Sequence, residues 1–335
     1  MNDFEKKTVC KKNPRYDIIT YEDIVNCKII PLNEVIKDYN TLCKRKDYHK
    51  TPCSDMGNRI IYQYQFPLLL ETNRKKKDDW GQKIKDEFSK DFTRKGMKGK
   101  DGITYWIDEA IKMDREKKKP CIYPVSIFEA FRKYGQSVNT FKAVCTKLLL
   151  EKYNNTNDGI LTVFDPTAGW GGRMLGAASS GHNYIGCDTN IELKIGYDKM
   201  IKDLNLKNVK IIYDDFRHVD LSTLGFDTVI TSPPYKNVEQ YNGMKLFETD
   251  EDYFYFLKKL INDCLKFIKP HGYVIINIKD ALYEEYLKHG GIECDFIEEL
   301  PQAKTKHKNR EKVFIFKPKK KKILYCKSTG KVKII

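Results

Sequence analysis

The sequence lacks the patterns that identify several large classes of protein. Its ten cysteines are scattered, with no Cys-x-x-Cys pair and no histidine at a ligand spacing, so no zinc site is predicted. No stretch approaches the roughly 18 apolar residues of a membrane-spanning helix, and the polar N-terminal residues contain no secretory signal segment. We therefore expect reduced thiols, no bound metal, and a protein of the cytoplasm or nucleus that is not secreted.

Two nucleotide-binding patterns are also missing. The glycine-rich part of the chain has neither the Gly-x-Gly-x-x-Gly spacing of dinucleotide sites nor the Gly-Lys-Ser/Thr that ends a triphosphate loop. No internal repeat of the solenoid or propeller type is visible. With 335 residues, the chain is long enough for one large domain, or two smaller ones, with a sizeable core.

Positive charge is in excess and is concentrated toward the C-terminal end. The chain has 61 Lys and Arg against 46 Asp and Glu, and residues 301–335 hold thirteen of these basic residues with a single acid, Glu311. A basic surface of this kind suits nucleic acid, because each phosphate that it neutralises releases counterions. For the lysine run at 319–322, a solvated tail is the alternative.

Residues 1–120 carry weaker patterns. Basic segments at 74–77 and 94–100 are interleaved with aromatic residues, which is typical of a nucleic-acid surface but also of a packed core. The elements predicted here are helices at 21–24, 32–36 and 102–118 and a strand at 59–66. These elements alone indicate no function.

A regular alternation of strands and helices begins near residue 125. A strand at 161–164 is joined to a helix beginning at Met174 by a glycine-rich turn, and glycine lets such a turn pass close to a ligand. The other predicted strands are 184–188, 209–213, 226–230, 273–278, 293–299 and 312–316, and the other predicted helices are 139–153, 191–204 and 251–267.

Acidic residues stand at the ends of successive strands. Asp188 ends the second strand, 23 residues after Asp165, where an acid can accept hydrogen bonds from both hydroxyls of a ribose. Asp214 and Asp215 end the third strand. Each acid taken alone is also typical of a helix N-cap, but three strands that end in acids, in order, indicate one ligand site.

The sequence Thr231-Ser232-Pro233-Pro234-Tyr235 follows the fourth strand. Its two prolines fix the backbone φ angle and remove two donors, so the carbonyl groups of Ser232 and Pro233 are expected to be free to accept hydrogen bonds from a ligand. Tyr235 offers a ring for stacking. An aromatic amine, such as that of a nucleobase, suits this arrangement.

Taken in order, these motifs resemble a known family. Asp-Pro-Thr-Ala-Gly-x-Gly-Gly at 165–172, the strand-end acids and Ser-Pro-Pro-Tyr at 232–235 are similar to the S-adenosylmethionine-dependent DNA methyltransferases that modify exocyclic base amines, over about residues 125–318. The resemblance implies the Rossmann-like class I methyltransferase fold of the α/β class: a mostly parallel seven-stranded sheet with an antiparallel terminal hairpin. The expected parts are an N-terminal accessory region at 1–120, a methyltransferase domain at 121–318 and a basic tail at 319–335.

The resemblance also assigns roles to residues. Asp165 would face the ammonium group of S-adenosylmethionine, Asp188 the ribose, and Asp215, slightly favoured over Asp214, the adenine amine. Pro166, Thr167, Ala168, Gly169 and Gly171 would surround the cofactor carboxylate. Ser232, Pro233, Pro234 and Tyr235 would hold and stack a flipped-out base. Residues 137–141 resemble a segment that covers the cofactor methionine, and equally an ordinary helix start. Lys304, Lys306, Lys308 and Arg310 would contact phosphates.

The target is expected to be DNA, with cytosine N4 slightly favoured over adenine N6, because serine at position 232 is common in cytosine-N4 enzymes. RNA bases, protein glutamine and a non-catalytic nucleic-acid-binding protein of the same fold stay open as alternatives. No long segment separates or follows the motifs. We therefore expect residues 1–120 and the basic tail to recognise the target, with restriction-modification as the setting that the resemblance implies.

Overall fold

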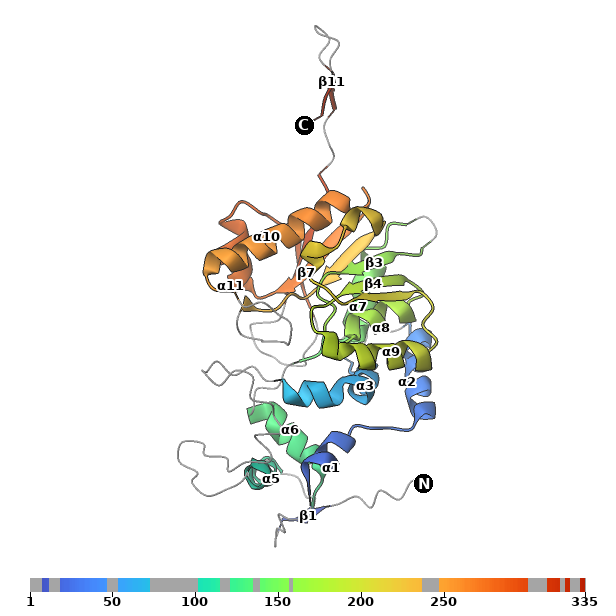
Figure 1. The fold of residues 1–335 in the computed structure, drawn as a ribbon, viewed down its shortest axis with the longest axis vertical. Coiled ribbons are helices and arrows are strands. Elements are labelled where there is room, and N and C mark those ends of the chain that lie inside the picture. The colour runs from blue at the N-terminus through green and yellow to red at the C-terminus, as the bar shows by residue number, and fades with distance from the viewer. Residues whose placement is uncertain are drawn as a thin grey trace.

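A seven-stranded sheet with helices on both faces forms the centre of the molecule (Figure 1). The computed structural model describes residues 8–11, 19–46, 54–72, 102–114, 121–134, 139–156, 159–236, 247–300, 312–319, 323–325 and 332–334. No helix in these ranges has the length and apolar composition needed to cross a membrane.

The sheet has the order β5-β4-β3-β6-β7-β9-β8. Its strands are β3 (Thr162–Asp165), β4 (Asn183–Cys187), β5 (Val209–Ile212), β6 (Thr228–Thr231), β7 (Tyr273–Ile278), β8 (Phe296–Glu299) and β9 (Lys312–Phe316). The neighbouring strands β5, β4, β3, β6 and β7 are parallel, whereas β9 runs antiparallel to both β7 and β8. The predicted Rossmann-like sheet with an antiparallel terminal hairpin is confirmed.

Alternating side chains of the central strands build two separate cores. On β3, Val163 belongs to one core and Phe164 to the other, and on β6 the same division separates Ile230 from Val229. Because successive side chains of a strand point to opposite faces, a continuous apolar run buries both faces of a strand. All four residues of β6 are buried. The strand that precedes the Ser-Pro-Pro-Tyr motif is therefore held on both sides.

Helices cover the two faces in layers (Figure 1). The first core is covered by α7 (Ala143–Lys152), α8 (Gly172–Ser179) and α9 (Lys194–Asp203). The second core is covered by α10 (Asp250–Phe267), and α11 (Asp280–Leu282) and the π-helix Tyr283–Lys288 also pack against it. Thr249 begins α10 with a capping box to Asp252. Short 3-10 turns follow β4 and β5 at Ile191–Leu193, Phe216–His218 and Leu221–Thr223.

Two helices of the N-terminal region share the first core. These are α2 (Leu32–Lys44) and α3 (Asn58–Glu71), and they contribute Val35, Leu42, Ile60, Ile61 and Leu69. The prediction of a strand at 59–66 is wrong, because the segment is part of the helix α3. Its apolar residues are buried in two different cores on different sides of this helix. Phe66 and Leu70 belong to a third core, which is described next.

A third core lies farther from the sheet. It is formed by α1 (Tyr21–Asn26), α5 (Gly102–Met113) and α6 (Pro124–Tyr134), and Trp106, Phe128 and Phe131 are fully or almost fully buried in it. α6 follows residue 120 but packs with α1 and α5, whereas α2 and α3 precede it and pack with the sheet layer. Packing contacts therefore link residues on both sides of position 120, and the division into an accessory region and a methyltransferase domain stays a prediction.

Two small antiparallel pairs complete the described elements. β1 (Val9–Cys10) pairs with β2 (Cys121–Ile122), and β10 (Ile323–Tyr325) pairs with β11 (Val332–Ile334). The first pair ties the beginning of the chain to the start of α6.

Candidate active site

One pocket collects residues from the carboxyl ends of the parallel strands β3 to β7, which is where open α/β sheets bind ligands. Most of the site residues expected from the sequence lie in its wall. The lining residues are Asn139, Thr140, Phe141, Pro166, Thr167, Ala168, Gly169, Trp170, Gly172, Arg173, Asp188, Thr189, Leu193, Asp215, Phe216, Arg217, Ser232, Pro234, Tyr235, Phe247, Phe256 and Asn277.

The glycine-rich loop brings backbone into this wall. Gly169 and Gly171 have φ angles of +62° and +94°, a left-handed conformation that favours glycine. Gly172 begins α8 so close to residues 139–141 that a Cβ atom there would lie 1.8 Å from the carbonyl oxygen of Phe141. The loop and the segment before α7 therefore form one continuous wall. Gly171 itself packs against Met200 and Tyr197 and is not part of the lining.

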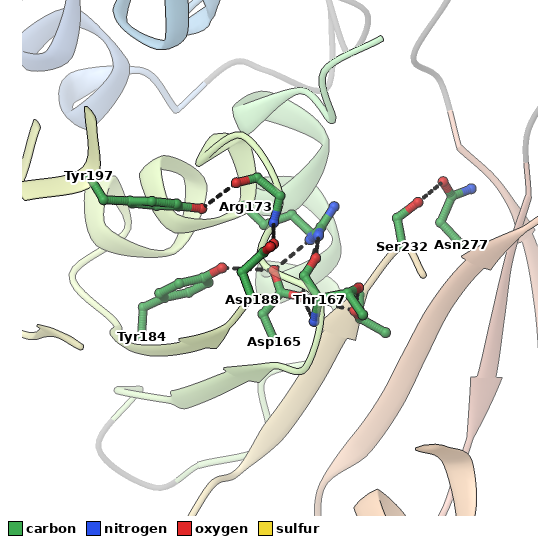
Figure 2. A network of polar contacts seen from close by, with 10 residues as sticks. Asp165, Thr167, Arg173, Tyr184, Asp188, Tyr197, Ser232 and Asn277 are labelled. Carbon is green, nitrogen blue, oxygen red and sulfur yellow. Dashed lines mark hydrogen bonds and ion pairs between the residues drawn. The ribbon is translucent and has the colours of Figure 1, made fainter. Parts of the chain in front are cut away.

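Asp165 lies beneath the loop instead of in the pocket wall (Figure 2). Its side chain is 0% exposed, and its Oδ2 atom accepts from Arg173 Nε at 2.6 Å and from the Tyr184 hydroxyl at 2.7 Å. Its Oδ1 atom accepts from the Thr231 hydroxyl at 2.9 Å. This differs from the expected position facing a cofactor ammonium group, because the carboxylate is enclosed by partners from β4, β6 and α8.

Arg173 joins this buried acid to the pocket. Its guanidinium group is paired with Asp165, donates to the carbonyl oxygen of Thr167 and lies 5.2 Å from the Phe141 ring centroid, and the residue also lines the pocket. The neighbouring carboxylate raises the pKa of Arg173 although burial alone would lower it. Arg173 thus presents a fixed positive charge at the start of α8.

Asp188 faces the pocket and also fixes the loop (Figure 2). Its Oδ2 atom accepts from the Gly169 backbone N–H at 2.7 Å and its Oδ1 atom from the Asn190 N–H at 2.9 Å. Burial raises the pKa of Asp188 to about 6, although these two hydrogen bonds act in the opposite direction. A carboxylate with this pKa changes charge close to neutral pH.

The two acids after β5 have different positions. Asp215 lines the pocket, and its carboxylate is held by the guanidinium group of Arg217, with Arg217 Nε 2.9 Å from Oδ1. Burial would raise the pKa of Asp215, but the hydrogen bonds from Arg217 lower it below its usual value. Asp214 is half exposed, bonds to His218 at 2.9 Å and is not part of the lining.

The Ser-Pro-Pro-Tyr motif leaves β6 at the other side of the pocket. Ser232, Pro234 and Tyr235 line the pocket, whereas Pro233 does not. The carbonyl oxygen of Pro234 accepts from the Tyr253 hydroxyl of α10 at 3.1 Å. Tyr235 is only 9% exposed, with Lys279 Nζ 5.3 Å from its ring centroid. The motif is therefore contacted by α10 through Tyr253 and by Lys279, the residue that follows β7.

The N-terminal helix α3 supports the side of the pocket that Leu193 lines. Gln65 is 0% exposed, and its Nε2 atom donates to the carbonyl oxygen of Leu193 at 3.2 Å. Leu193 lines the pocket, and α3 lies so close to α9 that a Cβ atom on Gly196 would be 2.5 Å from the amide of Gln65. Residues of the expected accessory region thus contribute to the shape of the site.

Several residues of the site were missed from the sequence. Arg173 and Asn277 stand in or beside apolar segments, where a buried polar side chain is a signal that was available. Phe247 and Phe256 come from α10 and the residues before it, and nothing in the sequence distinguishes them from other core aromatics. The phosphate contacts expected at Lys304, Lys306, Lys308 and Arg310 lie outside the described residues.

A comparison with protein families identifies the segment that contains the motif. Residues 226–333, about a third of the chain, match the family of DNA methylases that modify N6 or N4. The resemblance to DNA amino-methyltransferases is confirmed. The chain is also 32% identical, over 73 residues, to the type II methyltransferase M.MjaVI of Methanocaldococcus jannaschii. This match includes 22% of the chain and spans 38% of the length of that methyltransferase.

Solved structures similar to this chain include other methyltransferases. An rRNA methylase from Streptococcus thermophilus covers 54% of this chain and 98% of its own, with 12% identity and a TM-score of 0.38. The match to an RNA methyltransferase from Salinibacter ruber in complex with S-adenosyl-L-homocysteine covers 55% of this chain and 95% of that methyltransferase, with 16% identity and a TM-score of 0.37.

Proposed function

We propose that this chain is an S-adenosylmethionine-dependent methyltransferase that modifies an exocyclic amine of a DNA base. The observation that carries the proposal is the single pocket that contains both halves of the required site. The loop after β3, Asp188 and Asp215 line one part, and Ser232 and Tyr235 line the other. A methyl donor and an amine bound in these two parts would be next to each other, as a direct transfer needs.

The residues of the first part fit the cofactor chemically. Asp188 would accept from the ribose hydroxyls and Asp215 from the adenine amine. Arg173 and the first turn of α8 would attract the carboxylate, because both present positive charge to the pocket. Residues 139–141 would cover the methionine end. Asp165 would act from below, by holding Arg173 in place.

The residues of the second part suit an amine. When bound, S-adenosylmethionine supplies an electrophilic methyl group: a nitrogen–carbon bond forms, the carbon–sulfur bond breaks with its electron pair left on sulfur, and the nitrogen loses one proton to water. Ser232 Oγ, which lines the pocket, would accept an amine hydrogen and favour a more tetrahedral nitrogen, whose lone pair is then available. The carbonyl group of Pro233, the second acceptor expected from the sequence, does not line the pocket and would have to turn toward it to accept the other hydrogen. Tyr235 would contact the base after it leaves the duplex.

Cytosine N4 is the favoured target and adenine N6 the alternative. This preference rests on the serine at position 232 of the sequence. The geometry of the pocket does not add to it, because a hydrogen-bond acceptor can accept from either amine. DNA is favoured over RNA because residues 226–333 match a DNA methylase family. The basic residues of 301–335 suit either nucleic acid.

The test is methyl transfer from labelled S-adenosylmethionine to duplex DNA, single-stranded DNA and RNA, followed by nuclease digestion and mass spectrometry of the nucleosides. We expect N4-methylcytosine or N6-methyladenine in DNA, strongly reduced in Ser232→Ala and Tyr235→Ala. Ser222→Ala is the matched control, because the Ser222 hydroxyl donates to Asp220 in the turn after β5 and Ser222 does not line the pocket. Label in RNA alone would overturn the DNA assignment, and bound cofactor without any labelled nucleic acid would overturn the proposed activity.

We further propose that the N-terminal region and the basic tail take part in target recognition. Deleting residues 1–120 is not a clean test, because it removes α2 and α3 from the first core. Replacing the basic segment Arg74, Lys75, Lys76 and Lys77 with serine leaves both helices intact. An unchanged salt dependence of DNA binding and an unchanged methylation pattern in this variant would contradict a role for that segment.

A further inference from the structure

A single polar side chain interrupts the buried strand β7. Val274, Ile275, Ile276 and Ile278 are apolar and at most 1% exposed, whereas Asn277 between them is 2% exposed. Burying an amide costs free energy unless its hydrogen bonds are made. The register of β6 and β7 pairs Thr231 with Ile276, which brings Asn277 beside Ser232 (Figure 2).

The orientation of the Asn277 amide is set from the far side of β7. Its Nδ2 atom donates to the carbonyl oxygen of Lys312 on β9 at 2.8 Å. A carbonyl oxygen can only accept, so this contact requires the NH2 group and turns Oδ1 toward the Ser-Pro-Pro-Tyr motif. Oδ1 lies 3.1 Å from Ser232 Oγ and 3.5 Å from the Tyr235 hydroxyl.

This orientation fixes the direction of the Ser232 hydroxyl group. An amide oxygen has no proton to give, so Ser232 must donate its only hydrogen to Asn277. The lone pairs of Ser232 Oγ then remain for a ligand in the pocket, which both Ser232 and Asn277 line. Without Asn277, the hydroxyl could rotate and donate to a ligand as readily as it accepts from one.

We propose that Asn277 is a positioning and specificity-determining residue that makes Ser232 an obligatory acceptor, so that the site admits an amino group and rejects a carbonyl group at the same ring position. The inference rests on the proposed function. The inference adds a substrate class to the proposed function: aminopyrimidines or aminopurines are accepted and their keto counterparts are excluded. A keto oxygen would face Ser232 Oγ with no hydrogen between the two acceptors.

The first measurement uses the wild-type protein. The probe is a duplex oligonucleotide that carries the site methylated in the transfer assay. It is compared with a duplex in which the target cytosine is replaced by uracil, or the target adenine by hypoxanthine, and the opposite base is changed so that both duplexes are fully paired, because a mismatched base leaves the duplex more easily. We expect the keto duplex to bind at least about 10-fold more weakly in the presence of the methyl-free cofactor product. Equal binding of the two duplexes would overturn the inference, whatever happens to any variant.

The second measurement is a double-mutant cycle of Asn277→Leu with Ser232→Ala. Alone, Asn277→Leu should lower kcat about 10- to 100-fold, reduce the amino-to-keto preference, and leave the dissociation constant for S-adenosylmethionine within about twofold. In the Ser232→Ala background the same change should cost less than about twofold, because Asn277 acts through the missing hydroxyl. Fully additive losses would indicate a general structural role and overturn the inference.

Control variants separate the possible failures. Tyr253→Phe removes another hydrogen bond to the motif, at Pro234, and should leave the amino-to-keto preference unchanged. Asn277→Ser is the substitute if the leucine variant does not fold, since a serine hydroxyl can both donate and accept and so relaxes the orientation of Ser232. If wild-type protein binds cofactor but methylates no nucleic acid, the proposed function fails and this inference with it. If wild-type protein methylates DNA and the preference is absent, only this inference fails.

Discussion

Asp165→Asn tests whether the first acid of the glycine loop acts on the fold or on the ligand. The substitution keeps the size of the side chain and removes its charge, which leaves the guanidinium group of Arg173 without its partner although only 5% of that side chain is exposed. Removing one member of a buried ion pair costs about 3–5 kcal/mol. The new NH2 group would also face Arg173 or the donors Tyr184 and Thr231, so we expect the upper part of that range.

A loss of this size is a large part of the roughly 5–15 kcal/mol that stabilises a typical domain. Urea unfolding, followed by circular dichroism, should therefore show a clearly lower midpoint for Asp165→Asn. Asp188→Asn is the matched control, because Asp188 faces the pocket and accepts from two backbone N–H groups, which an asparagine oxygen can accept in part. It should weaken cofactor binding with a smaller loss of stability. If Asp165→Asn had wild-type stability and lost only cofactor binding, the assignment of Asp165 to the interior would be refuted.

Three further predictions concern the pocket. Because the pKa of Asp188 is raised to about 6, lowering the pH from 7.5 to 5 should weaken S-adenosylmethionine binding about tenfold in calorimetric titrations, and Asp188→Asn should abolish this pH dependence. The effect of pH on the stability of the cofactor-free protein has the opposite sign. Because the pKa of Asp188 is higher in the folded protein, at about 6, than in the unfolded chain, near 4, the contribution of Asp188 to the free energy of unfolding increases as the pH falls from about 6 to 4. A cofactor-free protein in which Asp188 lowers the stability over this interval would contradict the raised pKa. Gln65→Leu should raise the KM for the cofactor a few-fold with little change in kcat, because it removes the hydrogen bond to Leu193. Tyr64→Phe removes another contact between α3 and α9, to Asp203, and should leave the KM unchanged. Equal effects of the two substitutions on the KM would reject a specific role for Gln65. Gly172→Ala and Gly176→Ala should both lower the melting temperature, since each new Cβ atom meets backbone at less than 3.0 Å, but only Gly172→Ala should also reduce cofactor affinity, because only Gly172 lines the pocket.

Local sequence patterns were sufficient to predict the individual strands of the sheet. Each of the seven strands was expected within a few residues of its observed position, and β7 and β9 were expected at their observed bounds. These strands are short runs that end at turn residues or acids, and the inner strands β3, β6, β7 and β9 are buried on both faces, so propensity, pattern and tertiary environment favour the same structure there. The mostly parallel arrangement and the antiparallel terminal hairpin came from the resemblance to a family and not from the pattern itself.

The helix at 58–71 was not predictable in the same way. Arg59-Ile60-Ile61-Tyr62-Gln63-Tyr64-Gln65-Phe66 has the alternation and the aromatic content of a strand, and Pro67 discourages a helix. The helix forms because it is packed on two sides, with Ile61 and Leu69 in the first core and Phe66 and Leu70 in the third. A segment buried on opposite sides by two different cores has no single apolar stripe, so its periodicity does not reveal its structure.

The roles of the acids show why spacing alone gives an incomplete account of a site. Asp165, Asp188 and Asp215 all stand at the ends of parallel strands, and the sequence gives no reason to treat them differently. Their surroundings differ. Arg173, Tyr184 and Thr231, from three other elements, enclose Asp165. Asp188 accepts from the backbone N–H groups of Gly169 and Asn190, and Asp215 is paired with Arg217, two residues along the chain. The same logic applies to Ser232, whose hydroxyl direction depends on Asn277 and, through it, on a carbonyl group of β9. The chemistry of each strand-end residue is therefore determined by the groups around it, some on neighbouring elements and some two residues along the chain.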